Sequence, residues 1–325
     1  MHLKRLSLLI LFTAGLRLSL WAQPNRQIPS EKPRLIVEIV ASQMRFDYLT
    51  RYWDKFSDGG FKMLVNDGAS CKNARYSYLL TQAYPGIATI STGANPSIHG
   101  IISDSWFSRV NGEVVDAVAD EKTTTTGGSF ASGRASAKNL VTSTLGDEIC
   151  LNNPQSKVVS IALDAGSAIL MAGHSASGIY WLDTEKGGWV SSSYFSDSLP
   201  AWVDTLNAKS LAKLYAEKEW KAINPIQAYE ETDTLTARTP EGKKRVSDKI
   251  KLLIDGIIGK SEPATSYKKL LETPFGNSLT KDMAIASILG ESLGSDENTD
   301  LLCITFSANR YITRKFGPHS IEMED

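Results

Sequence analysis

The sequence has few cysteines, almost no net charge and only one long apolar segment, at its N-terminus. Its 325 residues carry a formal net charge of −1, which excludes a strongly basic surface for nucleic acids or anionic membranes. Beyond the N-terminus no segment approaches the ~20 apolar residues that a transmembrane helix needs. We therefore expect a mature chain with no stable membrane anchor and no nucleic-acid partner.

Cysteine is scarce, and the three cysteines are an odd number. At least one thiol must therefore be free or paired between chains. Cys303 lies in the apolar run 301–306, which predicts an inert, buried side chain. Cys71 and Cys150 are candidates for a disulfide, and the alternative, that the two side chains never meet, stays open.

The N-terminal segment has the pattern of a secretory signal peptide. Lys4 and Arg5 precede the apolar run 6–14, and a second apolar stretch ends at the small residue Ala22. This pattern predicts a signal peptide over residues 1–22 and a periplasmic or secreted product. The alternative is an uncleaved N-terminal anchor.

Three apolar runs predict buried parallel strands. They cover residues 35–40, 158–163 and 301–306, and each is apolar on both faces. With 42% hydrophobic and 22% charged residues, the composition is that of a globular protein.

Helical patterns lie between these runs. One helix is predicted over 60–67 and a third from a Thr280 cap to Gly294. Between them, a second helix is expected to be capped by Ser136 and to carry Leu140, Val141, Leu145 and Ile149. Strands that alternate with helices predict an α/β fold, with a mainly parallel sheet sandwiched by helices.

The region after the second strand breaks the alternation. Aromatic residues at 180, 181, 189 and 194 flank the turn 183–188 and predict a β-hairpin. The charged stretch 216–251 is expected to be an exposed excursion. Together they predict a cap-like insertion over about 178–275.

Short motifs follow the predicted strands, where the functional groups of α/β sheets gather. They lie at 42–49, 84–86, 91–93, 96–101, 172–174, 273–277 and 316–318. In this order the motifs resemble the alkaline phosphatase superfamily, above all its bacterial PafA-type members, with type I phosphodiesterases and nucleotide pyrophosphatases as more distant relatives. The resemblance extends over residues 33–325.

The resemblance implies two-metal phosphoryl transfer. In this family two zinc ions hold the phosphoryl group, a Thr or Ser attacks it, and an Asn and a Lys-x-Arg pair bind its oxygens. Such chemistry needs cations and hydrogen-bond donors around a negative transition state.

This chain departs from the family at each catalytic position that the resemblance assigns. Ala83 stands where the nucleophile is expected, and Asp104 where the Asn is expected. Asp164 and Gly166 stand at the two positions of the Lys-x-Arg clamp. An alanine has no hydroxyl with which to attack, and carboxylates repel phosphate.

The metal positions are substituted as well. Ser42, Arg310 and Arg314 stand where the family has three zinc ligands. The resemblance also assigns no ligand role to the histidines of the mature chain, at 99, 174 and 319, which we expect to be hydrogen-bonding structural residues. No cofactor is therefore expected.

In the family, the other three ligands lie beyond the Phe-Gly-Pro segment. Residues 23–325 are therefore expected to be the N-terminal portion of the domain, without its C-terminal part.

Three hypotheses follow. The first is a catalytically degenerate homologue that acts as a binding or interaction module for a small anion or a protein. The second is an active metal-dependent phosphomonoesterase or phosphodiesterase that uses another hydroxyl, at Thr81, Thr89 or Ser103. The third is a truncated gene product, whose sheet would be marginally stable because of an unpaired edge.

The reversed charges lead to a structural expectation. Because these positions converge in the family fold, we expect Arg310 and Arg314 to pair with Asp104 and Asp164 across the former metal site. The competing arrangement is an anion clamp, with the arginines turned away from the aspartates.

Overall fold

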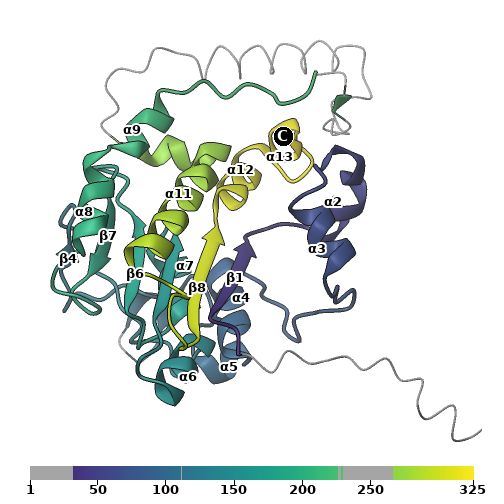
Figure 1. Cartoon of the computed structure of the whole chain (residues 1–325). Helices are drawn as coiled ribbons and strands as arrows, with labels where there is room; N and C mark the ends of the chain where they lie inside the picture. Colours follow the sequence, from purple (N-terminus) through teal and green to yellow (C-terminus); the bar gives the residue numbers. More distant parts are fainter. Residues whose placement is uncertain (1–31, 111, 226–227, 230–265) are drawn as a thin grey trace, which may run out of the picture. The chain divides into compact units, whose positions relative to one another are not determined.

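A mostly parallel sheet of six strands forms the centre of the fold (Figure 1). In spatial order its strands are β1 (Leu35–Ala41), β8 (Asp300–Phe306), β5 (Val158–Ala162), β6 (Gly178–Leu182), β7 (Trp189–Ser192) and β4 (Thr125–Thr126). The first four are parallel, whereas β6 with β7 and β7 with β4 pair antiparallel. The computed structural model describes residues 32–110, 112–225, 228–229 and 266–325.

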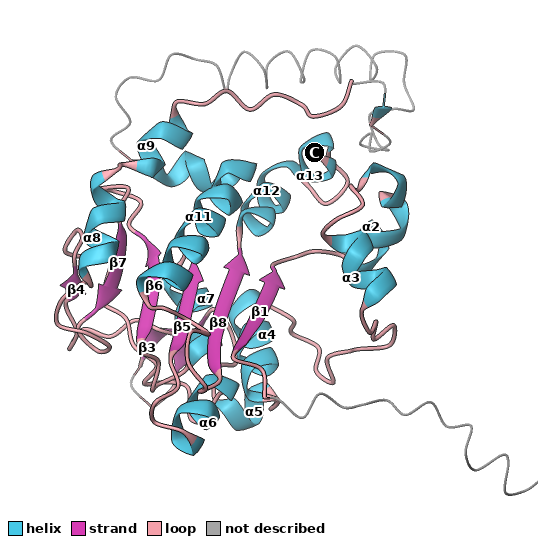
Figure 2. Ribbon diagram, in the orientation of Figure 1, coloured by secondary structure: helices cyan, strands magenta, loops and turns pink. Residues whose placement is uncertain are grey.

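Helices cover both faces of this sheet (Figure 2). On one face lie α4 (Ala83–Thr92), α6 (Leu145–Asn152) and α7 (Ala165–Ala172). On the other lie α8 (Ala201–Ala208), the 3-10 helix η3 (Tyr267–Glu272), α11 (Pro274–Gly290) and α12 (Ala308–Phe316). Side chains of β8 alternate between the two cores: Leu301 and Cys303 face one, Leu302 and Ile304 the other. The predicted α/β class and the positions of the three predicted parallel strands are confirmed. Strands β5 and β8 are buried as expected, whereas β1 is partly exposed.

Shorter elements complete the fold. They are α2 (Phe46–Arg51), the 3-10 helix η1 (Trp53–Lys55), α3 (Phe61–Asp67), α5 (Pro96–His99), the strand pair β2 (Ser105–Ser108) and β3 (Glu113–Asp116), α9 (Leu211–Ala216) and α13 (Ile321–Glu324). The helix predicted over 60–67 is α3.

The predicted helix cap at Ser136 is wrong. The Ser136 hydroxyl donates to Asp120 at 2.7 Å instead. The helix begins after Thr144, whose hydroxyl accepts from the Asp147 amide, while the Asp147 carboxylate accepts from the Thr144 amide. This reciprocal capping box satisfies two otherwise unpaired backbone donors, which a lone serine farther upstream does not.

The third predicted helix begins earlier and ends earlier than expected. Helix α11 starts at Pro274, and Thr280 lies within it, where its hydroxyl donates to the carbonyl of Gly276 at 3.0 Å. Proline suits the first helical turn because its missing N–H would be unpaired there anyway. The helix ends at Gly290, and Gly294, with φ of 71°, lies in the turn that follows.

The predicted hairpin is present as β6 and β7, but both strands belong to the central sheet. Strand β6 pairs parallel with β5, so that Trp181 lies opposite Ala162. The segment 178–192 is therefore not part of a separate cap. The proposed signal peptide lies outside the described residues, as does most of the charged stretch 216–251.

Strand β1 lies at the edge of the sheet, as the expectation of an unpaired edge requires. Val37 and Ile39 on this strand are 46% and 56% exposed, so the described residues cover one face of this edge strand only in part. Marginal stability of the isolated chain stays a prediction. None of the described helices is long and apolar enough to cross a membrane.

The candidate disulfide does not form. Cys71 is exposed, Cys150 is half-buried, and both are free thiols. Cys150 instead lies 3.5 Å from the carbonyl oxygen of Ser175. Cys303 is fully buried on β8, as predicted.

Candidate functional site

The carboxyl ends of β1, β5 and β8 meet at one edge of the sheet because the three strands are parallel neighbours (Figure 1). Ser42 follows β1, and its amide donates to the carbonyl of Phe306 at the end of β8. Asp164 follows β5 as the N-cap of α7, and Arg310 lies in the first turn of α12 after β8. The fold therefore brings these positions together where α/β sheets hold their functional groups.

Arg310 and Asp164 form a buried ion pair. The Arg310 Nη2 lies 2.8 Å from Oδ2 of Asp164, and the arginine side chain is only 3% exposed. The same carboxylate accepts hydrogen bonds from the amide and hydroxyl of Ser167, both at 3.0 Å, and from the hydroxyl of Ser307 at 3.1 Å. The carboxylate is thus compensated by one cation and three neutral donors.

Two tyrosine rings enclose the Arg310 guanidinium. Its central carbon lies 5.6 Å from the ring centroid of Tyr84 and 5.0 Å from that of Tyr311, whose hydroxyl accepts from Arg310 at 3.1 Å. Burial, together with the Asp164 charge, raises the pKa of Tyr84, so the ring is neutral. Within the described residues Arg310 Nε has no hydrogen-bond partner. The arginine is therefore held by one carboxylate, one hydroxyl and cation–π contacts.

The Tyr84 ring also fills the space beside Gly166. A Cβ atom added to Gly166 would lie 2.2 Å from the ring, far inside van der Waals contact. No side chain fits at this position unless Tyr84 moves. The place that the resemblance assigns to the second clamp residue is therefore occupied.

Arg314 and Asp104 form a second, outer pair. Arg314 Nη2 lies 3.6 Å from Oδ2 of Asp104, and the two side chains are 58% and 29% exposed. Asp104 also accepts from the backbone amide of Tyr84 at 2.9 Å. The expected pairing is confirmed, since Arg310 pairs with Asp164 and Arg314 pairs with Asp104. The arginines are not turned away from the aspartates, as an anion clamp would require.

The residues of this site do not fit a pair of zinc ions. Zinc sites need several His, Cys or carboxylate ligands, and the described part of the chain holds no cluster of three or more such side chains that could bind a metal. Ser42 offers a hydroxyl, while Arg310 and Arg314 bring positive charge. Both nearby carboxylates, Asp104 and Asp164, are already engaged by the arginines.

Neither Ala83 nor Thr89 is placed as an activated nucleophile, and the Ser103 hydroxyl donates to Oε1 of Gln82 at 2.6 Å. Ala83 begins α4 and has no side-chain oxygen. Thr89 contacts a histidine, with 3.1 Å between its Oγ1 and Nε2 of His99. However, Nδ1 of His99 accepts from the Ile101 amide, so the neutral ring carries its proton on Nε2 and donates to Thr89. Burial also lowers the pKa of His99, and a ring in this tautomer cannot take the threonine proton.

All three histidines of the described chain contact other protein groups. His99 links Thr89 to Ile101, His174 contacts Asp147 at 3.0 Å, and His319 lies within 3.2 Å of a guanidinium nitrogen of Arg45. These contacts agree with the expected structural roles. That none of the three is a metal ligand stays a prediction.

Sequence reasoning missed the groups that surround the inner pair, namely Tyr84, Ser167, Ser307 and Tyr311. One signal was available for Ser167. An aspartate just before a helix often caps it by accepting a hydrogen bond from the backbone amide three residues later. In α7 the cap is Asp164 and that amide belongs to Ser167. No local pattern predicts the contact of Tyr84, because this residue reaches the site from α4, whereas Tyr311 directly follows Arg310 on α12.

Comparison with known proteins agrees with this architecture. The family model described as type I phosphodiesterase / nucleotide pyrophosphatase matches residues 36–325. Alkaline phosphatase PhoV of Synechococcus elongatus is 38% identical over 295 residues, which cover 90% of this chain and 53% of that protein. A calcium-transporting ATPase of Myroides odoratus is 37% identical over 304 residues, covering 91% of this chain and 54% of that protein.

Solved structures lead to the same group. The crystal structure of wild-type alkaline phosphatase PafA superimposes with a TM-score of 0.78 at 33% identity, covering 90% of this chain and 56% of that chain. The chain thus spans about half the length of the relatives it matches. It belongs to the type I phosphodiesterase / nucleotide pyrophosphatase family and, within the alkaline phosphatase superfamily, groups with the PafA-type enzymes.

Proposed function

We propose that this chain is a catalytically degenerate member of the family, exported from the cytoplasm, that acts as a binding or interaction module. The observation that carries the proposal is the buried Arg310–Asp164 pair at the carboxyl edge of the sheet. A phosphoryl group is bound by cations and hydrogen-bond donors that are free to turn toward it. Here the buried cation is already neutralised by a carboxylate of the same chain.

The remaining groups support the same proposal. An attacking hydroxyl is missing at Ala83, and the tautomer of His99 leaves Thr89 without a base. Asp104 brings a second carboxylate to this edge of the sheet, where it pairs with Arg314 at 3.6 Å. The alternative hypothesis, an active hydrolase, would need a nucleophile together with either a metal ion or a base. The described residues around Ala83 and Thr89 provide neither of these two combinations.

Zinc content tests the proposal. We expect the purified natural gene product to hold far less than one zinc per chain after dialysis against micromolar zinc, measured by mass spectrometry of the metal. Ala83→Thr alone should restore no hydrolysis of p-nitrophenyl phosphate, because the metals that would lower the pKa of the new hydroxyl are missing. Two tightly held zinc ions, or activity from that single change, would contradict the proposal.

Export has its own test. The basic start and short apolar run of residues 4–22 motivate it. Expressed with its natural N-terminus in a Gram-negative host, the protein should appear in the periplasmic fraction with a new N-terminus directly after Ala22. N-terminal sequencing that finds Met1 on the exported protein would favour the uncleaved anchor instead.

A further inference from the structure

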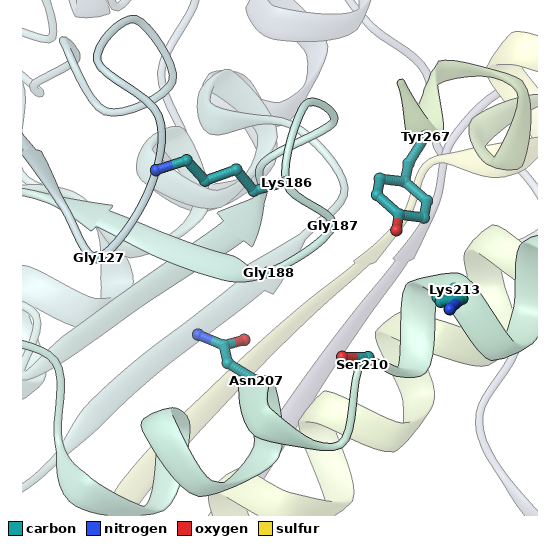
Figure 3. A pocket seen from close by; sticks show the side chains of 8 residues that line it. All are labelled: Gly127, Lys186, Gly187, Gly188, Asn207, Ser210, Lys213 and Tyr267. Carbon is teal, nitrogen blue, oxygen red and sulfur yellow. The ribbon is translucent and has the colours of Figure 1, made fainter. Parts of the chain in front are cut away.

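A pocket of about 220 Å³ opens beside the turn between β6 and β7 (Figure 3). Because β6 is parallel to β5, this turn lies at the carboxyl end of the sheet, where α/β proteins bind ligands. Its lining comes from separate segments of the chain. These supply Lys186 and Gly187 from the turn, Asn207 from α8, Ser210 and Lys213 from the start of α9, and Tyr267 from η3.

Hydrogen bonds hold the turn that forms one wall of the pocket. The fully buried Asp183 carboxylate accepts from the amide of Ser129 at 2.7 Å, from its hydroxyl at 3.0 Å and from the amide of Glu185 at 2.9 Å. The amide of Tyr267 donates to the carbonyl of Thr184 at 2.6 Å, which ties η3 to the same turn. The wall is therefore fixed before any ligand arrives.

The opposite wall is fixed by Asn207. Its side-chain oxygen accepts from the Trp189 amide at 2.7 Å, and its nitrogen donates to the Trp189 carbonyl at 2.9 Å. The chain then turns sharply at Ser210, a non-glycine residue with a left-handed φ of 50°. Such a conformation costs roughly 1–3 kcal/mol and is frequent at ligand sites. It directs the chain from α8 into α9 along the rim of the pocket.

Three polar groups at this pocket have no partner within the described part of the chain. They are the hydroxyl of Ser210, the hydroxyl of Tyr267 and the ammonium group of Lys213. Figure 3 shows the Tyr267 hydroxyl directed into the space that Ser210 also borders. The second cation, Lys186, donates to the carbonyl of Gly128 at 3.1 Å, which keeps its charge at the wall.

The charge of the lining selects the ligand. Two lysines line the pocket, and none of its lining residues is acidic, so an anionic group is favoured. The free hydroxyls and the edge of the Tyr267 ring suit a compact molecule that bears hydroxyl groups. The volume of about 220 Å³ is below the range of roughly 300–1,000 Å³ that drug-sized ligands occupy.

We propose that this pocket binds an acidic monosaccharide, that is, one sugar ring with a single phosphate or carboxylate group. The anionic group lies at Lys213, and the ring hydroxyls bond Ser210 and Tyr267. None of the residues that line this pocket belongs to the site around Arg310 and Asp164. The proposal therefore goes beyond the proposed function, because it assigns a class of ligand to a second site.

Titration calorimetry on the full natural product tests the proposal. Glucose 6-phosphate and glucuronate should both bind, glucose should bind at least 10-fold more weakly, and inorganic phosphate should bind more weakly than glucose 6-phosphate. Glucuronate has no phosphoryl group, so its binding is independent of any hydrolytic activity. Raising the salt concentration from 50 mM to 500 mM should weaken binding of both acids, because exposed charges are screened.

Variants locate the binding. Lys213→Ala should weaken glucuronate binding about 10-fold, which corresponds to about 1.4 kcal/mol, and Tyr267→Phe should weaken it several-fold. Lys209→Ala is the matched control, since Lys209 is an exposed lysine four residues away that does not line the pocket, and it should change the affinity less than twofold. The proposal is overturned if neither acid binds at millimolar concentration, if glucose binds as well as they do, or if Lys213→Ala and Lys209→Ala have equal effects.

Discussion

Replacement of Arg310 by alanine is expected to lower the free energy of unfolding by about 3–5 kcal/mol. The change would leave the Asp164 carboxylate without its cation at a position where the arginine was only 3% exposed. It would also remove the cation–π contacts of the guanidinium with the rings of Tyr84 and Tyr311. Urea denaturation followed by tryptophan fluorescence measures the loss.

Arg314→Ala is the matched control for this prediction. Arg314 lies one helical turn farther along α12 and pairs with Asp104, but its side chain is 58% exposed. Exposed pairs contribute about 0–1 kcal/mol, so this variant should remain close to the parent. A double-mutant cycle of Arg310→Ala with Asp164→Ala should give a coupling energy above about 1 kcal/mol. Equal effects of the two arginine changes would mean that the inner pair is not buried as described.

Asp147→Ala is expected to destabilise the protein by roughly 3 kcal/mol or more. The carboxylate is 3% exposed and accepts from the amides of Thr144, His174 and Ser175 at 2.7–3.0 Å, and from the His174 ring at 3.0 Å. Its removal would leave several inward-facing donors unpaired and would abolish the capping box of α6. Glu148→Ala, at the exposed neighbouring position in the same helical turn, should change stability by less than about 0.5 kcal/mol.

The Asp147–His174 pair makes the stability of the protein depend on pH, and the direction of this dependence can be worked out. The hydrogen bond to Asp147 raises the pKa of His174 above 6.5, so this contribution is complete below about 6.5 and is lost as the pH rises through the folded-state value. Burial would raise the pKa of Asp147, but hydrogen bonds from His174 and from backbone amides lower it. Its contribution is present above the unfolded-state value near 3.8 and is lost as the pH falls toward the folded-state value.

Unfolding measured across pH 5–9 should therefore show stability declining on the alkaline side. In His174→Asn this decline should be smaller, because asparagine can still donate to Asp147 but does not titrate. An unchanged slope in that variant would show that another group is responsible.

The sequence allowed the three strands to be predicted because each is a short, mostly apolar run, and the run 301–306 lies within β8. It also allowed the charge reversal to be recognised, since Arg310 and Asp164 stand at positions that meet in the family fold. The expected pairing followed from the opposite charges at these converging positions.

Other features depend on contacts between distant segments, which no local pattern reveals. Tyr84 fills the space beside Gly166 from a different helix, and Thr144 rather than Ser136 caps α6 because its hydroxyl also reaches the carbonyl of Ala172 at 2.8 Å. Strand β6 looked like one arm of an isolated hairpin, but its pairing with β5 places it in the main sheet. The binding pocket beside it, formed by residues between 127 and 267, had no signal in the sequence.

An assay of ester hydrolysis by the full natural gene product is the most direct test of the central claim, namely that the site around Arg310 and Asp164 is inactive. The protein would be purified from the periplasm, supplied with micromolar zinc and assayed with p-nitrophenyl phosphate and bis-p-nitrophenyl phosphate from pH 6 to pH 10. Because Arg310 is neutralised by Asp164 and no nucleophile replaces Ala83, we predict no release of p-nitrophenol above the rate of a buffer blank. Zinc-dependent turnover of either ester that disappears with a chelator would contradict the account and identify the chain as an active hydrolase.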